Sequence, residues 1–313
     1  MLANDPCQGA ERETQDGQVM IELLAGGAAQ AIRWEELGLR PGIELGFFTL
    51  RYYSLAYLGG ILLAYWQVSK MVRAPGSPMA QRHVDDLFFW CTLGIILGGR
   101  LGYAAFYQPA LFTSWDSTET VPWALLRLWD GGMSFHGGLI GTTLAMAWVA
   151  CRGGVSFIRV TDYVSVVVGF GMLFGRLANF INGELWGRPT DGVPWAMIFP
   201  RDPLGLPRHP SQLYEAVLEG LVVVVIMLPL FWKTRARWRP GVLTGCFVTL
   251  ISLGRFTAEF FREADAQLAW VPQTTGLNMG QWLTIPLIVA GIGLTAWALR
   301  QPEIGAARQP ATA

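Results

Sequence analysis

The chain has 313 residues, of which 52% are hydrophobic and 15% are charged, and its 23 basic and 23 acidic side chains cancel. A soluble globular domain carries about 25% charged residues, so this composition argues against a cytosolic enzyme and against a disordered chain. Without net positive charge there is no global field to attract nucleic acid, and we expect no nucleic-acid partner.

The first 46 residues are acidic, with eight Asp or Glu against three Arg. They do not resemble a signal peptide, because no basic leader precedes a long apolar core. The semi-apolar stretch 20–32 has 13 residues, which favours an interfacial or surface helix over a membrane span. We expect 1–46 to form a periplasmic extension, and the sequence assigns it no function.

Seven apolar stretches follow the extension. Spanning ~30 Å of hydrocarbon takes about 20 mostly apolar residues at ~1.5 Å rise each. The stretches that approach this length are 47–68, 87–106, 134–151, 163–181, 213–232, 241–261 and 282–299. The pattern predicts an all-α, polytopic membrane protein with seven transmembrane helices.

The basic residues between the stretches predict how the chain is oriented. Eleven Lys or Arg lie in the connections 69–86, 152–162 and 233–240 and in the C-terminal tail, whereas five lie in the other three connections, 107–133, 182–212 and 262–281. Cytoplasmic connections carry the excess of Lys and Arg, so the N-terminus should be outside and the C-terminus inside. We therefore expect a membrane domain over 47–300, with a periplasmic loop or head region at 182–212, and a cytoplasmic tail over 301–313.

Four arginines interrupt the apolar stretches: Arg51, Arg100, Arg176 and Arg255. Charges at membrane depth are costly and usually functional, although snorkelling or a structural ion pair explains one isolated Arg about equally well. Three of the four lie 13 or 14 residues from the inner end of their stretch, in the outer third of the hydrocarbon core. Snorkelling would populate both leaflets about equally, so this bias favours a site that opens to the outer leaflet.

Further polar groups share that outer level: Tyr53, His136, Glu215, Glu219 and Glu259. Arg176 shares a helix face with Asn179, and Arg255 can pair with Glu259 one turn later. Glu215 and Glu219 would repel each other unless one is protonated or a cation lies between them. Arginine is suited to bidentate recognition of phosphate, so the cluster suits an anionic phospholipid headgroup.

His136 is a candidate for proton transfer, which histidine performs near neutral pH. Taken alone, a structural histidine would be favoured about two to one; beside the arginine cluster we favour function. Gly137 and Gly138 follow it and allow close approach of a backbone or a ligand. The 31-residue loop 182–212 is also expected to be functional, either capping the site or holding a second substrate.

Five motifs carry a resemblance to a known family: GGRLGY at 98–103, GGMSFHGGLIG at 131–141, GRLANFINGELWGR at 175–188, RHPSQLYE at 208–215 and GRFTAEFFREADAQ at 254–267. Over roughly 47–300 the sequence resembles the prolipoprotein diacylglyceryl transferases, and the motif at 175–188 is very specific. Ala264 departs from the family, which usually has Pro there, and the N-terminal extension is not covered by the resemblance.

The resemblance implies a bacterial inner-membrane enzyme with its active site toward the periplasmic leaflet. Such an enzyme transfers the sn-1,2-diacylglyceryl group of phosphatidylglycerol to the lipobox cysteine of a preprolipoprotein signal peptide. The products are a thioether and glycerol 1-phosphate, and the reaction begins lipoprotein maturation. The implied partners are thus phosphatidylglycerol, the preprolipoprotein and the lipid bilayer, with no cofactor.

The resemblance also implies roles for individual residues. His136 would be a base or proton relay, Arg176 and Asn179 would hold the phosphate, and Arg255 would stabilise the leaving group or activate the thiol. Tyr53 would hydrogen-bond the headgroup and Gly187 is a sensitive glycine. The acidic residues Glu184, Glu215 and Glu259 would orient the arginines or serve as alternative bases, so the base remains open between His136 and a glutamate. Arg100 joins the expected substrate-binding residues.

Two other classes of function compete with the transferase. A transporter would need polar groups at several depths, whereas the inner halves of these stretches are bare. An anionic-lipid-binding scaffold would explain the arginines but not His136 beside two glycines. Ser134 is too close to His136 in sequence for an intramembrane serine protease, and the sequence has no HExxH motif for a zinc protease. We expect no metal requirement, because no His, Cys and Asp residues have ligand spacing.

Overall fold

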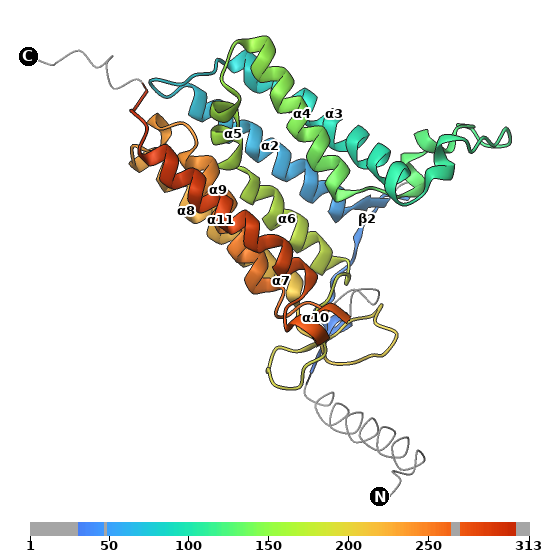
Figure 1. Cartoon of the computed structure of the whole chain (residues 1–313). Helices are drawn as coiled ribbons and strands as arrows, with labels where there is room; N and C mark the ends of the chain where they lie inside the picture. The colour runs from blue at the N-terminus through green and yellow to red at the C-terminus, as the bar shows by residue number, and fades with distance from the viewer. Residues whose placement is uncertain (1–30, 47–48, 264–269, 305–313) are drawn as a thin grey trace, which may run out of the picture. The chain divides into compact units, whose positions relative to one another are not determined.

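The computed structural model describes residues 31–46, 49–263 and 270–304 (Figure 1). The predicted surface helix at 20–32 and the tail beyond 304 therefore fall largely or wholly outside the described residues, as does Ala264. The rest of the chain is mostly helical. Its longer helices are α2 (Tyr52–Val72), α3 (Gln81–Phe106), α4 (Phe135–Gly153), α6 (Val168–Ile181), α8 (Val222–Lys233), α9 (Val242–Ala258) and α11 (Met279–Leu299).

Shorter elements connect these helices. They comprise the helices α5 (Phe157–Ser165), α7 (Ser211–Glu215) and α10 (Trp270–Thr275), and the π-helix η5 (Ala216–Leu221). Two small sheets add to the predicted helices: β1 (Ile32–Arg33) pairs in parallel with β4 (Met197–Ile198), and β2 (Gly42–Glu44) pairs antiparallel with β3 (Thr49–Arg51).

Each of the seven apolar stretches is helical over most of its length. Within the described ranges, three helical segments are long and apolar enough to cross a membrane, namely α3, α11 and the continuous run Ser211–Lys233 through α7, η5 and α8. A fourth is added if α5 and α6, which meet at a bend of 44°, form one span. The structure thus supports a helical membrane protein, and the full count of seven spans remains a prediction.

The chain divides into two compact units. The first takes its described residues from Met1–Gly60, Val168–Ile226 and Cys246–Gly293, and the second from Ile61–Val167, Met227–Gly245 and Leu294–Ala313. Several helices contribute one part to each unit. We describe each unit separately.

Glycines bring the helices of the first unit close together. A Cβ at Gly220 of η5 would come within 2.7 Å of the Leu173 backbone of α6. On the other side, a Cβ at Gly254 of α9 would come within 2.9 Å of the Leu218 carbonyl oxygen. Because α6, η5 and α9 approach at backbone distance, polar side chains near their ends converge on a small volume. A π-helical turn inside a longer helix is frequent at functional sites, and η5 directly follows Glu215.

In the second unit α3 and α4 lie side by side (Figure 1). Gly94 and Gly98 of α3 face Gly141 and Gly137 of α4, and a Cβ at Gly94 would come within 2.6 Å of the Gly141 carbonyl oxygen. Small residues at this spacing let membrane helices pack backbone to backbone. Gly137, expected to allow approach of a backbone or a ligand, therefore faces the backbone of α3.

Gly137 and its neighbour provide a matched test of this packing. A Cβ at Gly137 would overlap the Gly98 carbonyl oxygen, whereas a Cβ at Gly138 would meet its nearest neighbour, the Ile95 oxygen, at 3.6 Å. We expect Gly137→Ala to lower stability by about 1–3 kcal/mol through overpacking, seen as a lower thermal unfolding midpoint in detergent. Gly138→Ala should leave the midpoint nearly unchanged. Equal effects of the two substitutions would contradict this packing.

Candidate active site

The candidate site in the first unit is built around the carboxylate of Glu215, which is fully buried at the end of α7. Three guanidinium groups surround it. Arg176 of α6 lies 2.7 Å from its Oε2, Arg255 of α9 lies 3.4 Å from the same oxygen, and Arg262 lies 2.8 Å from Oε1. A buried carboxylate needs such partners, because an unpaired charge at this depth is very costly.

Two further carboxylates complete the cluster around Arg255. Glu259, one turn along α9, forms an ion pair with Arg255 and lies 3.5 Å from Arg262. Glu219, at 2% exposure, lies 3.9 Å from Arg255, and its Oε1 has no hydrogen-bond partner among the described residues. The predicted pair of Arg255 and Glu259 is confirmed, and Glu215 and Glu219 are both placed against arginine.

We define the arginine cluster as Arg176, Arg255 and Arg262 with the carboxylates Glu215, Glu219 and Glu259. The carboxylate side chains are at most 7% exposed, whereas the guanidinium side chains are 20%, 29% and 21% exposed. The acids therefore lie beneath the arginines and hold them. Each guanidinium has five N–H donors, and those not used by glutamate remain free to bind an anion such as a phosphate.

Arg262 is the residue of this cluster that the sequence analysis missed. Burial disfavours its charge, but the negative charges of Glu215, Glu259 and Glu219 outweigh that effect and raise its pKa above the ordinary value. Its position carried a usable signal, since it follows Glu259 by three residues and Arg255 by seven. That spacing continues one face of the helix beyond the predicted end of the span.

A second polar chain extends from Arg176 toward the loop after α6. Arg176 donates to the Asn179 Oδ1 at 3.4 Å, and the Asn179 side-chain amide donates to the Glu184 carboxylate at 2.9 Å. Tyr53, at the start of α2, contacts Tyr57 through the two hydroxyls at 3.2 Å and lies beside Asn179 and Glu184. Arg176, Asn179, Glu184 and Tyr53, all expected in the site, are thus brought together.

The loop 182–212 is tied into the same region by backbone hydrogen bonds. The Gly187 N–H donates to the His209 carbonyl at 2.9 Å, and the Arg188 N–H donates to the Phe261 carbonyl at 3.0 Å. A Cβ at Gly187 would overlap the Phe261 oxygen, which explains why glycine is needed there. The loop therefore joins the start of α7 to the segment after α9, close to Glu215 and Arg262.

A buried ion pair fixes the outer part of this loop. Arg208 is 2% exposed and makes two contacts with Asp202, at 2.6 and 3.0 Å, and one with Glu263 at 2.6 Å. Burial opposes ionisation of Asp202, but its hydrogen bonds from Arg208 and from backbone N–H groups lower its pKa below the ordinary value. The loop is therefore an ordered part of the site rather than a simple linker.

His209 provides a pH-dependent test of the loop. Its Nδ1 lies 3.1 Å from the Tyr214 hydroxyl, which accepts a hydrogen bond from the Trp195 indole at 2.6 Å. The hydroxyl can then donate its own proton to Nδ1, which favours the neutral imidazole. Burial, and next the charge of Arg188, lower the pKa of His209.

A histidine held neutral contributes its full stability above the pKa of the unfolded chain, about 6.5, and loses it as pH falls from there through the lower pKa of the folded protein. We expect the thermal midpoint of the wild-type protein to fall more than that of His209→Gln between about pH 7.5 and about pH 5. Parallel pH profiles of the two proteins would contradict this account of His209.

Arg100 belongs to the second unit, where it is 4% exposed. Its guanidinium donates to the carbonyls of Leu125, Ala124, Arg127, Gly132 and Gly131. These contacts hold the segment between α3 and α4 and use the donors that a phosphate would need. The substrate-binding role expected for Arg100 stays a prediction.

His136 is the second residue of α4, also in the second unit, and is exposed. Its ring packs edge to face against the Phe135 ring, with the two ring centres 5.6 Å apart. It makes no hydrogen bond to any described residue. The preceding Ser134 caps the helix by accepting from the Gly137 N–H. Both ring nitrogens of His136 are therefore free to exchange a proton with a ligand.

The described residues contain no group of three or more His, Cys, Asp or Glu side chains arranged to hold a metal ion. The chemistry that this geometry supports is recognition of an anion by arginines held from beneath.

Comparison with known proteins agrees with this chemistry. The sequence model of the family described as prolipoprotein diacylglyceryl transferase matches residues 42–297. A protein from Erythrobacter litoralis, named phosphatidylglycerol–prolipoprotein diacylglyceryl transferase, is 57% identical over 290 residues, which are 93% of this chain and all of that protein.

Proteins of the same name from Rhodospirillum rubrum and Zymomonas mobilis are 49% and 46% identical. Their alignments cover 80% and 84% of this chain and 88% and 92% of theirs. This identity and coverage, together with the family match over most of the chain, identify the family of the protein. The chain belongs to the prolipoprotein diacylglyceryl transferase family.

Proposed function

We propose that this protein transfers the sn-1,2-diacylglyceryl group of phosphatidylglycerol to the lipobox cysteine of a preprolipoprotein. The observation that carries the proposal is the arginine cluster, in which three partly exposed guanidinium groups are held over buried carboxylates. The family membership and the names of the relatives support the same reaction.

In this reaction the thiol loses its proton, and the sulfur attacks the sn-3 carbon of the diacylglycerol moiety, which bears the phosphate. The new C–S bond forms as the C–O bond to phosphate breaks, and glycerol 1-phosphate leaves with the bonding electrons. The phosphodiester is already a monoanion, and breaking its C–O bond places a second negative charge on the departing phosphate. Donors fixed in advance around that phosphate therefore lower the barrier. The thiolate is the competent nucleophile, which requires a base or a positive field.

The contacts support a proposed role for each residue. Arg176 and Arg255 bind the departing phosphate, Asn179 and Tyr53 orient the headgroup, and Arg262 joins them. Glu215, Glu259 and Glu184 hold the donors in place, and Gly187 lets the loop approach. His136, whose ring nitrogens are free, takes the thiol proton. Arg100 holds the segment 124–132 within the second unit.

The placement in the cell is part of the proposal. Seven spans, with the N-terminus in the periplasm and the C-terminus in the cytoplasm, would put the arginine cluster at the outer leaflet of the inner membrane. Residues 1–46 would form a periplasmic extension, 47–300 the transferase domain and 301–313 a cytoplasmic tail. Cysteine labelling of single sites in the connections 69–86 and 107–133 from either side of the membrane tests this orientation.

A transfer assay tests the reaction. Purified protein in detergent is mixed with phosphatidylglycerol and a peptide that carries a lipobox cysteine, and the peptide is weighed by mass spectrometry. We expect a diacylglyceryl adduct with the cysteine peptide and none when serine replaces that cysteine. A folded protein that binds phosphatidylglycerol without transfer would favour the scaffold, and solute flux into proteoliposomes without transfer would favour a transporter.

A further inference from the structure

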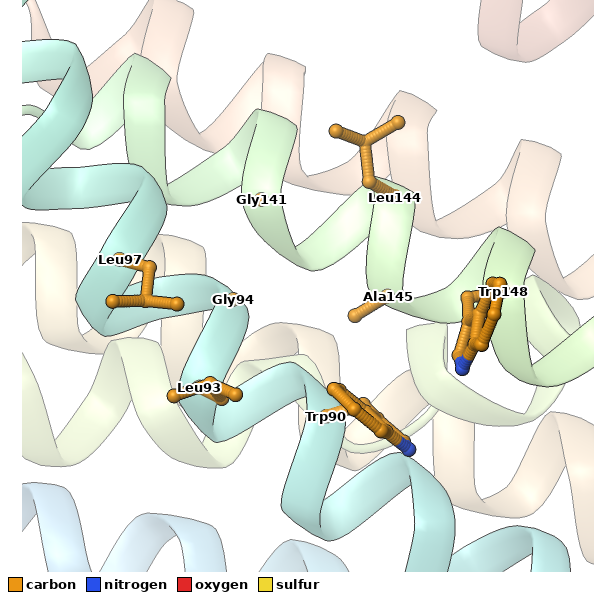
Figure 2. A pocket seen from close by; sticks show the side chains of 8 residues that line it. All are labelled: Trp90, Leu93, Gly94, Leu97, Gly141, Leu144, Ala145 and Trp148. Carbon is orange, nitrogen blue, oxygen red and sulfur yellow. The ribbon is translucent and has the colours of Figure 1, made fainter.

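The second unit carries an apolar groove that the proposed reaction does not use (Figure 2). It has a volume of about 480 Å³ and lies between α3 and α4. Its floor is the contact of Gly94 with Gly141, where the two backbones touch and no side chain fills the space. Its walls are the side chains of Trp90, Leu93, Leu97, Leu144, Ala145 and Trp148. Every side chain that lines the groove is apolar apart from the two indole N–H groups.

The dimensions of the groove match part of one membrane leaflet. From Trp90 to Leu97, and from Gly141 to Trp148, each helix advances seven residues, or about 10 Å. One leaflet contributes about 15 Å of hydrocarbon. Figure 2 shows the two tryptophans at one end of the groove and Leu97 at the other. The centres of the two indole rings are 6.3 Å apart, and the rings are arranged edge to face. Tryptophan gathers at the membrane–water boundary, so this end is the mouth.

A cationic side chain, that of Arg152, lies at this end of the groove. Arg152 follows Trp148 by one helical turn, and its guanidinium lies 5.5 Å from the centre of the Trp148 ring. Arg152 is exposed and forms no ion pair with any residue that the structure describes. On α3, Asp86 lies one turn before Trp90 and Arg82 one turn before that, and both are exposed. These three charges sum to one positive charge; the neighbouring Asp85 accepts a hydrogen bond from Tyr65 of α2 and is not counted with them.

We propose that this groove is a binding site for an anionic phospholipid, with one acyl chain between α3 and α4 and the phosphate at Arg152. An apolar groove that covers part of one leaflet and ends in a tryptophan pair, beside a guanidinium that has no ion-pair partner among the described residues, is complementary to such a lipid in both shape and charge. The proposal requires membrane insertion and does not rest on the transfer reaction, because none of the residues that line the groove has a role in that reaction.

Photo-crosslinking tests the site directly. The full-length protein is placed in phosphatidylcholine nanodiscs that contain a trace of a phospholipid with a diazirine in its acyl chain, and crosslinked peptides are mapped by mass spectrometry. A probe with a glycerol headgroup should label 90–97 and 141–148 about fivefold more than a choline probe with the same chains, as expected for one surface arginine. Arg152→Gln should remove this preference.

Lys70 provides the matched control. Its ammonium lies 5.1 Å from the centre of the Trp66 ring, so Lys70→Gln removes a similar cation–aromatic pair from a helix that does not line the groove. It should leave the labelling of α3 and α4 unchanged. We expect Arg152→Gln and Lys70→Gln to keep the transfer activity of the wild type. A change in labelling would then be separate from any loss of the proposed reaction.

Three results would overturn the proposal. Equal labelling by the glycerol and choline probes would remove the role of charge, and labelling unaffected by Arg152→Gln would remove the role of that residue. Labelling of α3 and α4 no stronger than that of the exposed α11 residues Leu283, Leu287 and Val289 would mean ordinary lipid contact. Crosslinks between two protein copies at these helices in place of lipid would assign the groove to a dimer.

Discussion

Replacing Arg176 with alanine is expected to reduce diacylglyceryl transfer by at least about 100-fold, as found when one preorganised donor to a developing anion is removed. Arg176 lies 2.7 Å from Glu215 and also donates to Asn179, so it links the carboxylate beneath the arginine cluster to the polar chain that reaches Glu184. The initial rate of adduct formation, measured by mass spectrometry at saturating lipid, checks the prediction.

Two controls separate this effect from a loss of fold. Arg176→Lys keeps the charge that balances Glu215 but loses the planar fork, so it should fold like the wild type and still transfer poorly. Arg201→Ala removes another arginine near Glu184, at 3.8 Å and 62% exposed, and should retain most activity. Activity in Arg176→Ala above about a tenth of the wild-type rate would exclude Arg176 as a phosphate ligand.

Replacing His136 with alanine is the second large expected effect, again a loss of at least about 100-fold, the scale of general acid–base catalysis. The ring is exposed and its nitrogens have no hydrogen-bond partner among the described residues. The imidazole therefore contributes little to the stability of the fold and is available for proton transfer. Phosphatidylglycerol binding and the thermal midpoint should be nearly unchanged in His136→Ala, so the loss should appear in the rate of the chemical step.

The contact partner of His136 is the appropriate control. Phe135→Leu removes the ring that meets the imidazole edge to face but keeps an apolar side chain, and we expect its transfer rate to stay within about threefold of the wild type. If His136→Ala transfers at a rate comparable to that of the wild type, a glutamate of the arginine cluster would be the base. Glu219, with one oxygen free of hydrogen bonds, would then be the first candidate.

Much of the first unit could be predicted because its signals are local. Arg176 with Asn179 and Arg255 with Glu259 are one helical turn apart, and such spacing places side chains on one face whatever the tertiary fold. The apolar stretches likewise predicted helices, because hydrophobic length and composition decide helix formation in a membrane. In the structure both pairs are in contact, and all seven stretches are mostly helical.

Other features depend on tertiary contacts and have no local signal. Glu215 is the common partner of Arg176, Arg255 and Arg262, and only the close packing of α6, η5 and α9 brings these groups together. The carbonyl oxygens that accept hydrogen bonds from Arg100 lie in the segment between α3 and α4, whose path could not be predicted from composition. Gly137 was expected to allow the approach of a backbone or a ligand, and the structure identifies the group as the backbone of the facing helix α3.

The central claim is that the arginines hold a phosphate that leaves from carbon. The most direct measurement uses phosphatidylglycerol with ¹⁸O at the oxygen that bridges the diacylglycerol carbon and phosphorus. If sulfur attacks carbon, the released glycerol 1-phosphate retains the label and the peptide gains an unlabelled diacylglyceryl thioether. Label found in free diacylglycerol, with sulfur bound to phosphorus, would contradict the account.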